Sequence, residues 1–169
     1  KFGSTEITAK PERVITVGLT DHDSVLALGI VPLGTTDWMG RYPAAVGPWA
    51  QAQLGDTLPE LVGDVEALNF EKIAALQPDV ILALYSGITQ EQYDILSAIA
   101  PTVAQPAAYT DYGIPWQELT QTAGQALGLS AAAEQLVADV DDKFAQVRAE
   151  HPEFADMVAV IAMPGDGAF

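Results

Sequence analysis

The chain has 169 residues, of which 49% are apolar, so it is long enough for one packed core and is expected to be globular. It carries 7 basic and 23 acidic residues, and a formal net charge of −16 argues against nucleic acid as a partner. There is no cysteine, which excludes disulfides and cysteine nucleophiles, and no apolar run reaches the length of a membrane span.

Short apolar runs alternate with helical segments along the first part of the chain. Residues 13–18 are typical of a buried strand, and Gly29 is a natural end for a helix over 23–28. A short second strand is expected within 30–36. The segment 37–49 is irregular and rich in aromatic residues, glycine and proline. This alternation is typical of an α/β protein.

The middle of the chain carries the clearest strand, over 79–84. Every residue from Val80 to Leu84 is apolar, which indicates a strand buried on both faces, as in a parallel sheet. Asn69 can cap the short helix that follows it. The other elements expected here are a short helix and turn over 50–60, a strand over 61–63, helices over 70–76, 90–100 and 115–127, and a weak strand over 101–104.

The longest predicted helix covers 131–151, with Ser130 as its cap. Five of its apolar residues fall on one stripe at helical spacing, namely Leu136, Val137, Val140, Phe144 and Val147. A further buried strand is expected over 158–162.

These elements predict an α/β fold. A parallel-sheet lobe with helices on both faces is followed by one long connecting helix and by the first strand of a truncated second α/β lobe. We expect the N-terminal lobe at 1–129, the connecting helix at 130–151 and the start of the C-terminal lobe at 152–169. Ligands of open parallel sheets bind beyond the carboxyl ends of the strands, so the residues that follow each strand are candidates for a binding site.

Three stretches of the sequence resemble one protein family. They are "RVITVG…DSVLALGIVPLGTTDW", "LNFEKIAALQPDVILA" and "APTVA…PWQELTQTAGQALG". In order and spacing they are similar to the periplasmic or surface-anchored binding proteins that feed ferric siderophores to ABC importers, whose fold the vitamin B12 and haem receptors share. The resemblance implies two α/β lobes joined by one long helix, with the ligand in the cleft between them. It also implies a ferric siderophore as ligand, no covalently bound cofactor and no enzymatic activity.

Two groups of side chains are candidates for the ligand site. Tyr85 and Ser86 stand at the end of the strand over 79–84, where the ring would line a cleft and the hydroxyls would donate to ligand oxygens. The irregular segment after the second strand is crowded with large side chains and one cation, namely Trp38, Met39, Arg41, Tyr42 and Trp49. Such aromatic residues are costly to leave wet unless they pack or bind, and Arg41 could meet the oxygens of an anionic chelate.

Each of these candidates also has a structural interpretation. Tyr85 could pack over the edge of the sheet, and Trp49 could belong to the core. Arg41 could pair with Asp37 or Asp56 on the surface.

Thr20 and Asp21 follow the first strand and are expected to face the ligand. The same stretch, Thr20-Asp21-His22-Asp23, permits two other interpretations. A metal site is one, but the chain has only two histidines, so no metal is expected. The other is a haloacid-dehalogenase-like phosphatase that uses Asp21 and Asp23, although neither residue directly follows the strand. Haem or a corrinoid remains an alternative ligand for the same fold.

Three further residues lie at the margins of this interpretation. The resemblance implies that Glu71 docks to arginines of the membrane permease, whereas its place at a helix start also suits a carboxylate. Tyr109 and Tyr112 follow the last strand and could form the rim of the cleft or simply pack a loop. The expected partners are ABC permease subunits, and the intact protein is expected to be a monomer. Its expected location is the periplasm or the cell surface, with a lipid anchor upstream of this chain.

Overall fold

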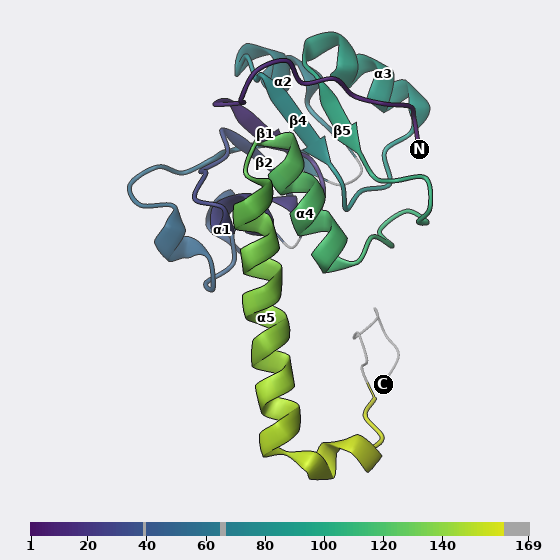
Figure 1. Cartoon of the computed structure of the whole chain (residues 1–169). Coiled ribbons are helices and arrows are strands. Elements are labelled where there is room, and N and C mark those ends of the chain that lie inside the picture. The colour runs from purple at the N-terminus through teal and green to yellow at the C-terminus, as the bar shows by residue number, and fades with distance from the viewer. Residues whose placement is uncertain (39, 65–66, 161–169) are drawn as a thin grey trace, which may run out of the picture. The chain divides into compact units, whose positions relative to one another are not determined.

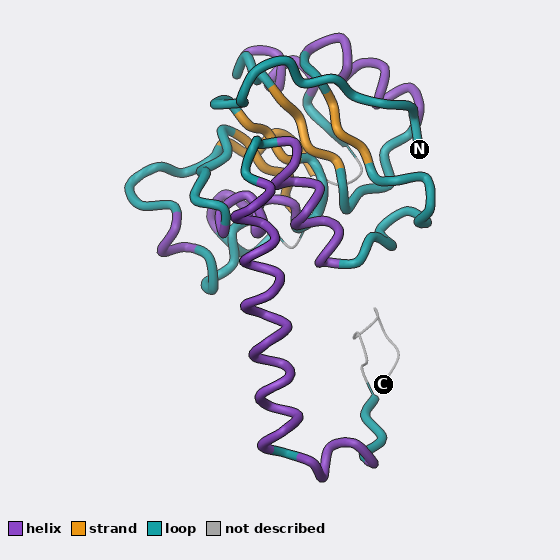
Figure 2. Tube along the Cα trace, in the orientation of Figure 1, coloured by secondary structure: helices purple, strands orange, loops and turns teal. Residues whose placement is uncertain are grey.

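A five-stranded parallel sheet forms the centre of the fold (Figure 1 and Figure 2). Its strand order is β3-β2-β1-β4-β5, and all neighbouring strands run parallel. The strands are β1 (Val14–Thr16), β2 (Gly34–Asp37), β3 (Glu60–Asp64), β4 (Val80–Ala83) and β5 (Thr102–Ala104). The predicted parallel sheet is therefore confirmed, and each predicted strand of the first lobe is found in its place.

Both faces of the sheet are buried. Successive side chains of β4 and of the residue after it point to opposite faces, and each face carries an apolar cluster. Val80, Leu82 and Leu84 pack into one apolar cluster, which also contains residues of α1 and α4. Ile81 and Ala83 pack into a second cluster with residues of α2 and α3. Figure 1 shows the two pairs of helices on opposite faces of the sheet. The unbroken apolar run over 80–84 thus belongs to a strand buried on both faces of a parallel sheet, as the sequence indicated.

Four helices cover the sheet. They are α1 (Asp21–Ala27), α2 (Phe70–Ala75), α3 (Gln90–Ile99) and α4 (Trp116–Ala126). Asn69 caps α2 by accepting a hydrogen bond from the N–H of Lys72 over 2.9 Å. Thr89 and Gln92 form a reciprocal capping box at the start of α3. The described residues also form three short 3₁₀ helices, namely η1 (Pro43–Ala45), η2 (Gln51–Gln53) and η3 (Pro152–Asp156).

Helix α1 begins two residues earlier than predicted, at Asp21, and ends as expected near Gly29. The N–H of Gly29 donates to the carbonyl of Leu26 over 2.9 Å, and that of Ile30 donates to Val25 over 3.1 Å. This paired pattern needs a left-handed residue after the helix, and Gly29 supplies it with a φ of 82°.

The structure describes residues 1–38, 40–64 and 67–160. The chain divides into two compact units, Lys1–Val137 and Ala138–Phe169. The long helix α5 (Ser130–Glu150) begins in the first unit, where a Cβ at Gly124 of α4 would lie 2.3 Å from Cβ of Ala133. Such a close approach is open only to glycine. The division into three parts at residues 129 and 151 stays a prediction.

The described part of the second unit corrects one sequence prediction. Residues 157–160 have no regular secondary structure, and Val158 and Val160 are exposed, so the strand expected over 158–162 is not formed there. Residues 161 and 162 lie outside the described residues. A strand requires a neighbour to satisfy its backbone hydrogen bonds, and the described residues of this unit contain no other strand.

Candidate functional site

The candidate site lies where the strand order reverses, between β1 and β4. The chain continues from β1 to β2, which lies on one side of β1. The later strand β4 lies on the other side of β1. In open parallel sheets, ligands bind beyond the carboxyl ends of the strands at such a switch point. The segments that leave the two strands are side by side, because the N–H of Leu19 donates to the carbonyl of Tyr85 over 3.0 Å. We call this region the carboxyl edge of the sheet.

Asp21 ties these two segments together. Its Oδ2 accepts a hydrogen bond from the N–H of Leu84 over 2.7 Å, and its Oδ1 accepts one from the N–H of Tyr85 over 2.9 Å. A Cβ at Gly18 would lie 2.4 Å from both carboxylate oxygens, so a side chain there would displace the carboxylate. Burial raises the pKa of Asp21 to about 6, against the backbone N–H groups of Tyr85, Leu84 and Gly18, which lower it.

The expected contact between Asp21 and the ligand is therefore not supported by this geometry. The side chain is fully buried and both of its oxygens are held by backbone donors, so it fixes the shape of the carboxyl edge without lining it. The phosphatase hypothesis is not favoured for the same reason, because a nucleophilic carboxylate must reach its substrate. Its second acid, Asp23, accepts hydrogen bonds from Trp49.

The other residues predicted at the ends of β1 and β4 divide into two kinds. Thr20 and Tyr85 are half-buried, and Thr20 makes no side-chain cap bond to α1. The ring of Tyr85 meets that of Tyr112 edge to face, with 5.8 Å between their centres. Ser86 differs, because it is buried and its Oγ donates to the carbonyl of Ala83 over 2.8 Å. Its hydroxyl proton is thus used within the protein, contrary to the expectation that it donates to a ligand.

The segment after β2 carries exposed candidates. Trp38 directly follows β2, so it stands at the carboxyl edge, and 39% of it is exposed. Arg41 is exposed, and the ion pairs found in the described part of the chain do not include it, so they give no support to the structural interpretation of this residue. Met39 lies outside the described residues.

Trp49 is not a core residue, since 61% of it is exposed. Its indole N–H lies 3.1 Å from both carboxylate oxygens of Asp23, the third residue of α1. Asp23 lies in the first turn of α1, two residues after Asp21, which is hydrogen-bonded to the segment that leaves β4, so this contact places Trp49 at the carboxyl edge as well. Its ring meets that of Tyr42 edge to face, with 6.0 Å between the centres.

His22 is buried next to Asp23, and its Nδ1 has no hydrogen-bond partner. Burial lowers the pKa of His22, against the neighbouring Asp23 carboxylate and the backbone of Ala45, which raise it. Two successive residues with positive φ, Ala44 and Ala45, shape the loop over it. Nowhere in the described ranges do three or more histidine, aspartate or glutamate side chains gather as a metal site would require.

Of the remaining predicted residues, Tyr109 is already engaged within the protein and Glu71 is exposed. Tyr109 donates its hydroxyl proton to Glu118, and this hydrogen bond raises the pKa of Tyr109. Its ring packs against the core, which favours the loop-packing interpretation. Glu71 is exposed in the first turn of α2, next to an ion pair of 3.2 Å between Lys72 and Glu60. Its docking role stays a prediction.

A small hollow opens at the carboxyl edge, and the sequence did not point to all of its residues. Besides Ser86 and Tyr112, its lining includes Leu19, Gly87 and Gln92. Leu19 follows β1 and could have been found from that position alone. Gln92 belongs to α3, and only the fold brings it to this edge.

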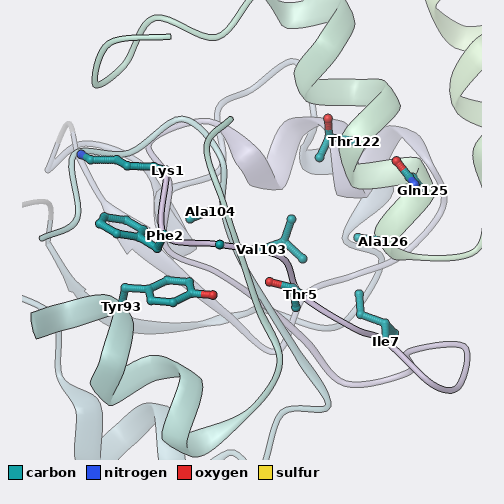
Figure 3. Close-up of a pocket in the computed structure, with 11 residues that line it drawn as sticks. Lys1, Phe2, Thr5, Ile7, Tyr93, Val103, Ala104, Thr122, Gln125 and Ala126 are labelled. Atoms are coloured by element: carbon teal, nitrogen blue, oxygen red, sulfur yellow. The ribbon is translucent and has the colours of Figure 1, made fainter. Parts of the chain in front are cut away.

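A larger cavity, of about 320 Å³, lies elsewhere, beside β5 (Figure 3). It is lined by the N-terminal segment and by side chains of α3, β5 and α4, among them Phe2, Tyr93, Val103 and Gln125. None of the predicted ligand residues lines it. The smaller hollow therefore fits the strand-end rule, whereas the larger cavity does not. Within the described residues, no helix is both long enough and apolar enough to cross a membrane.

A family model and a curated relative both point to the same protein family. A family model described as periplasmic binding protein matches residues 14–169. The probable siderophore-binding lipoprotein YfiY of Bacillus subtilis (strain 168) is 30% identical over 149 residues, which cover 86% of this chain and 42% of that protein.

Solved structures agree in fold. A periplasmic solute binding protein from Mycobacterium smegmatis str. MC2 155 is 42% identical with a TM-score of 0.85, over 90% of this chain and 53% of that one. PiaA from Streptococcus pneumoniae TIGR4, solved in complex with ferrichrome, is 36% identical with a TM-score of 0.79, over 90% and 51%. Staphylococcus aureus SirA complexed with staphyloferrin B is 32% identical with a TM-score of 0.72, over 91% and 51%. The chain spans about half the length of these proteins.

Proposed function

The chain belongs to the periplasmic binding protein family, and from this we propose that it forms one lobe of a protein that captures a ferric siderophore and delivers it to an ABC importer. The proteins that it resembles are substrate-binding proteins, and two solved relatives are bound to siderophores, namely ferrichrome and staphyloferrin B. A ferric siderophore is therefore the proposed cargo, held without a covalent cofactor.

One observation carries this proposal. Partly exposed aromatic side chains from three separate segments stand near the ends of different strands, since Trp38 follows β2, Tyr85 follows β4 and Trp49 contacts Asp23 of α1. Binding sites for organic ligands are lined mostly by apolar and aromatic side chains with a few polar groups. Here the aromatic faces would contact the organic part of the chelate. The hydroxyl of Thr20 and the guanidinium of Arg41 are the polar groups available to its oxygens.

The rest of the binding event requires surfaces beyond this chain. We propose that a second lobe closes the other side of the ligand and that Glu71 contributes to docking on the permease. The relatives are periplasmic proteins or lipoproteins, which implies a location outside the cytoplasm. A lipid anchor upstream of this chain and a monomeric intact protein are part of the same proposal, as is the lack of catalytic activity.

Tryptophan fluorescence tests this function directly, because Trp38 and Trp49 stand at the proposed site. The full-length protein is titrated with ferric hydroxamate, catecholate and carboxylate siderophores, with haem and cobalamin as controls. We expect saturable quenching by at least one siderophore class and none by the controls at equal concentration. Saturation only with haem or cobalamin would reassign the ligand. A phosphomonoester with magnesium should not be turned over, and turnover that is lost in Asp21→Asn would make the protein an enzyme.

A further inference from the structure

Trp49 is held in one orientation although most of its surface is exposed. Its Nε1–H points at Asp23, with both carboxylate oxygens at 3.1 Å. Its ring lies over Gly47, where a Cβ would come within 2.3 Å of it, and it meets Tyr42 at an interplanar angle of 78°. An exposed indole without such contacts would sample several rotamers, and holding it in advance reduces the entropy lost on binding.

Asp23 also brings a negative charge to the end of this ring. Its side chain is 32% exposed, and among the ion pairs of the described residues it has no lysine or arginine partner. Its one basic neighbour is His22, whose Nε2 lies 3.7 Å away. Burial disfavours a proton on that histidine, so the carboxylate charge is not neutralised. A ligand that stacks on Trp49 therefore lies close to an uncompensated carboxylate.

We propose that Asp23 is a specificity-determining residue of the ligand site. As a hydrogen-bond acceptor it orients Trp49, and by its charge it disfavours anionic ferric complexes. Asp23 would accordingly shift the preference of the lobe toward neutral or cationic chelates, of which ferric hydroxamates are the main class, and away from ferric catecholates, which Arg41 by itself would favour. This inference rests on the proposed function, but its orientation half can be tested without any ligand.

Two substitutions separate the two roles of Asp23. Asp23→Asn keeps an oxygen that can accept from the indole N–H but removes the charge. Asp23→Ala removes both. Glu12→Gln is the matched control, because Glu12 is exposed just before β1, at the opposite edge of the sheet, and its replacement removes one equal charge.

Orientation is read from the indole N–H resonance of Trp49 in the ligand-free, ¹⁵N-labelled full-length protein, assigned with Trp49→Phe. We expect the resonance to shift in Asp23→Ala and to stay close to its original position in Asp23→Asn and in Glu12→Gln. An unshifted resonance in Asp23→Ala would overturn the orienting role. This result does not depend on which ligand the protein carries.

Selectivity is read from calorimetric affinities for ferrioxamine B, a cationic hydroxamate complex, and ferric enterobactin, an anionic catecholate complex. Asp23→Asn should raise the affinity for the catecholate relative to the hydroxamate by about threefold to tenfold at low salt, and by less at high salt. Glu12→Gln should change this ratio by less than about twofold. An unchanged ratio in Asp23→Asn would overturn the selectivity role. If the unsubstituted protein binds neither complex nor any other siderophore, the proposed function falls and takes the selectivity with it.

Discussion

Trp38 and Tyr85 are the residues on which ligand affinity is expected to depend most. They are partly exposed, and they follow β2 and β4 at the carboxyl edge. In the full-length protein, Trp38→Ala and Tyr85→Ala should each weaken siderophore binding by about 1–3 kcal/mol, the range of aromatic anchors in buried contacts. Isothermal calorimetry measures this loss. Tyr93→Ala is the control, since Tyr93 stacks on Phe2 beside β5 and should leave affinity unchanged. If Trp38→Ala and Tyr85→Ala bound the siderophore as tightly as Tyr93→Ala and the unsubstituted protein, the ligand would have to bind elsewhere.

Asp21 is expected to make stability depend on pH. Its pKa in the folded protein is about 6, above its ordinary value of 3.8, so the folded state holds the proton more tightly than the unfolded state. Its contribution to the free energy of unfolding is therefore fully present below the ordinary value and is lost as the pH rises to about 6. The change is at most about 3 kcal/mol.

Asp21→Asn has no such titration and provides the comparison. Urea unfolding of both proteins, followed by fluorescence from about pH 4 to about pH 7, should show the unsubstituted protein gaining stability relative to the variant at the acidic end. Asp94→Asn, at an exposed carboxylate on α3, should show no comparable trend. A stability difference between protein and Asp21→Asn that is constant with pH would contradict the burial of this carboxyl.

At the scale of single residues, the sequence predicted positions but not contacts. That Asp21, Trp38 and Tyr85 stand near strand ends follows from the order of the elements. The hydrogen bonds of Asp21 join residues 63 and 64 positions apart, and the Asp23–Trp49 contact joins residues 26 positions apart. No local pattern encodes such pairings. The position of Asp21 after β1 therefore predicts contact with the ligand, whereas the fold buries its side chain.

The helix α2 is the element expected to meet the permease. Glu71 is exposed in its first turn. Glu71→Ala should leave siderophore affinity unchanged but reduce uptake by cells, and Glu71→Lys should reduce it further because like charges then face each other. Glu91→Lys is the control, since Glu91 occupies the same position in α3 and is also exposed. Normal uptake with Glu71→Lys would leave this residue as a carboxylate that stabilises a helix start.

Elements with a complete local signal were predicted well. The apolar run of β4, the cap at Asn69 and the terminal glycine of α1 each reflect interactions within a few residues or burial in a finished core. The strand expected over 158–162 had the right composition, but a strand is stable only beside another strand. The apolar stripe of α5 also has the composition of a buried surface without being buried there. Phe144 and Val147, which belong to the second unit, are exposed.

On the scale of the whole molecule, we propose that the chain provides one wall of the ligand site. It spans about half the length of its relatives, and the hollow at its carboxyl edge is small. Ligand pockets bury most of a small ligand's surface, which one wall cannot do. The 169-residue chain should therefore bind a ferric siderophore at least about 100-fold more weakly than the full-length protein, a difference of about 3 kcal/mol. Calorimetry on both forms measures this, and equal affinities would show that a second lobe adds nothing.

The position proposed for the siderophore is at the carboxyl ends of β1 and β4. It is tested most directly by backbone and indole NMR of the full-length protein, with the gallium form of a bound siderophore as a diamagnetic substitute for the ferric form. We expect the resonances that shift most to belong to residues at this edge, namely Leu19, Thr20, Trp38, Tyr85 and Gly87. Shifts concentrated instead around the cavity beside β5, at Tyr93 and Val103, would contradict it.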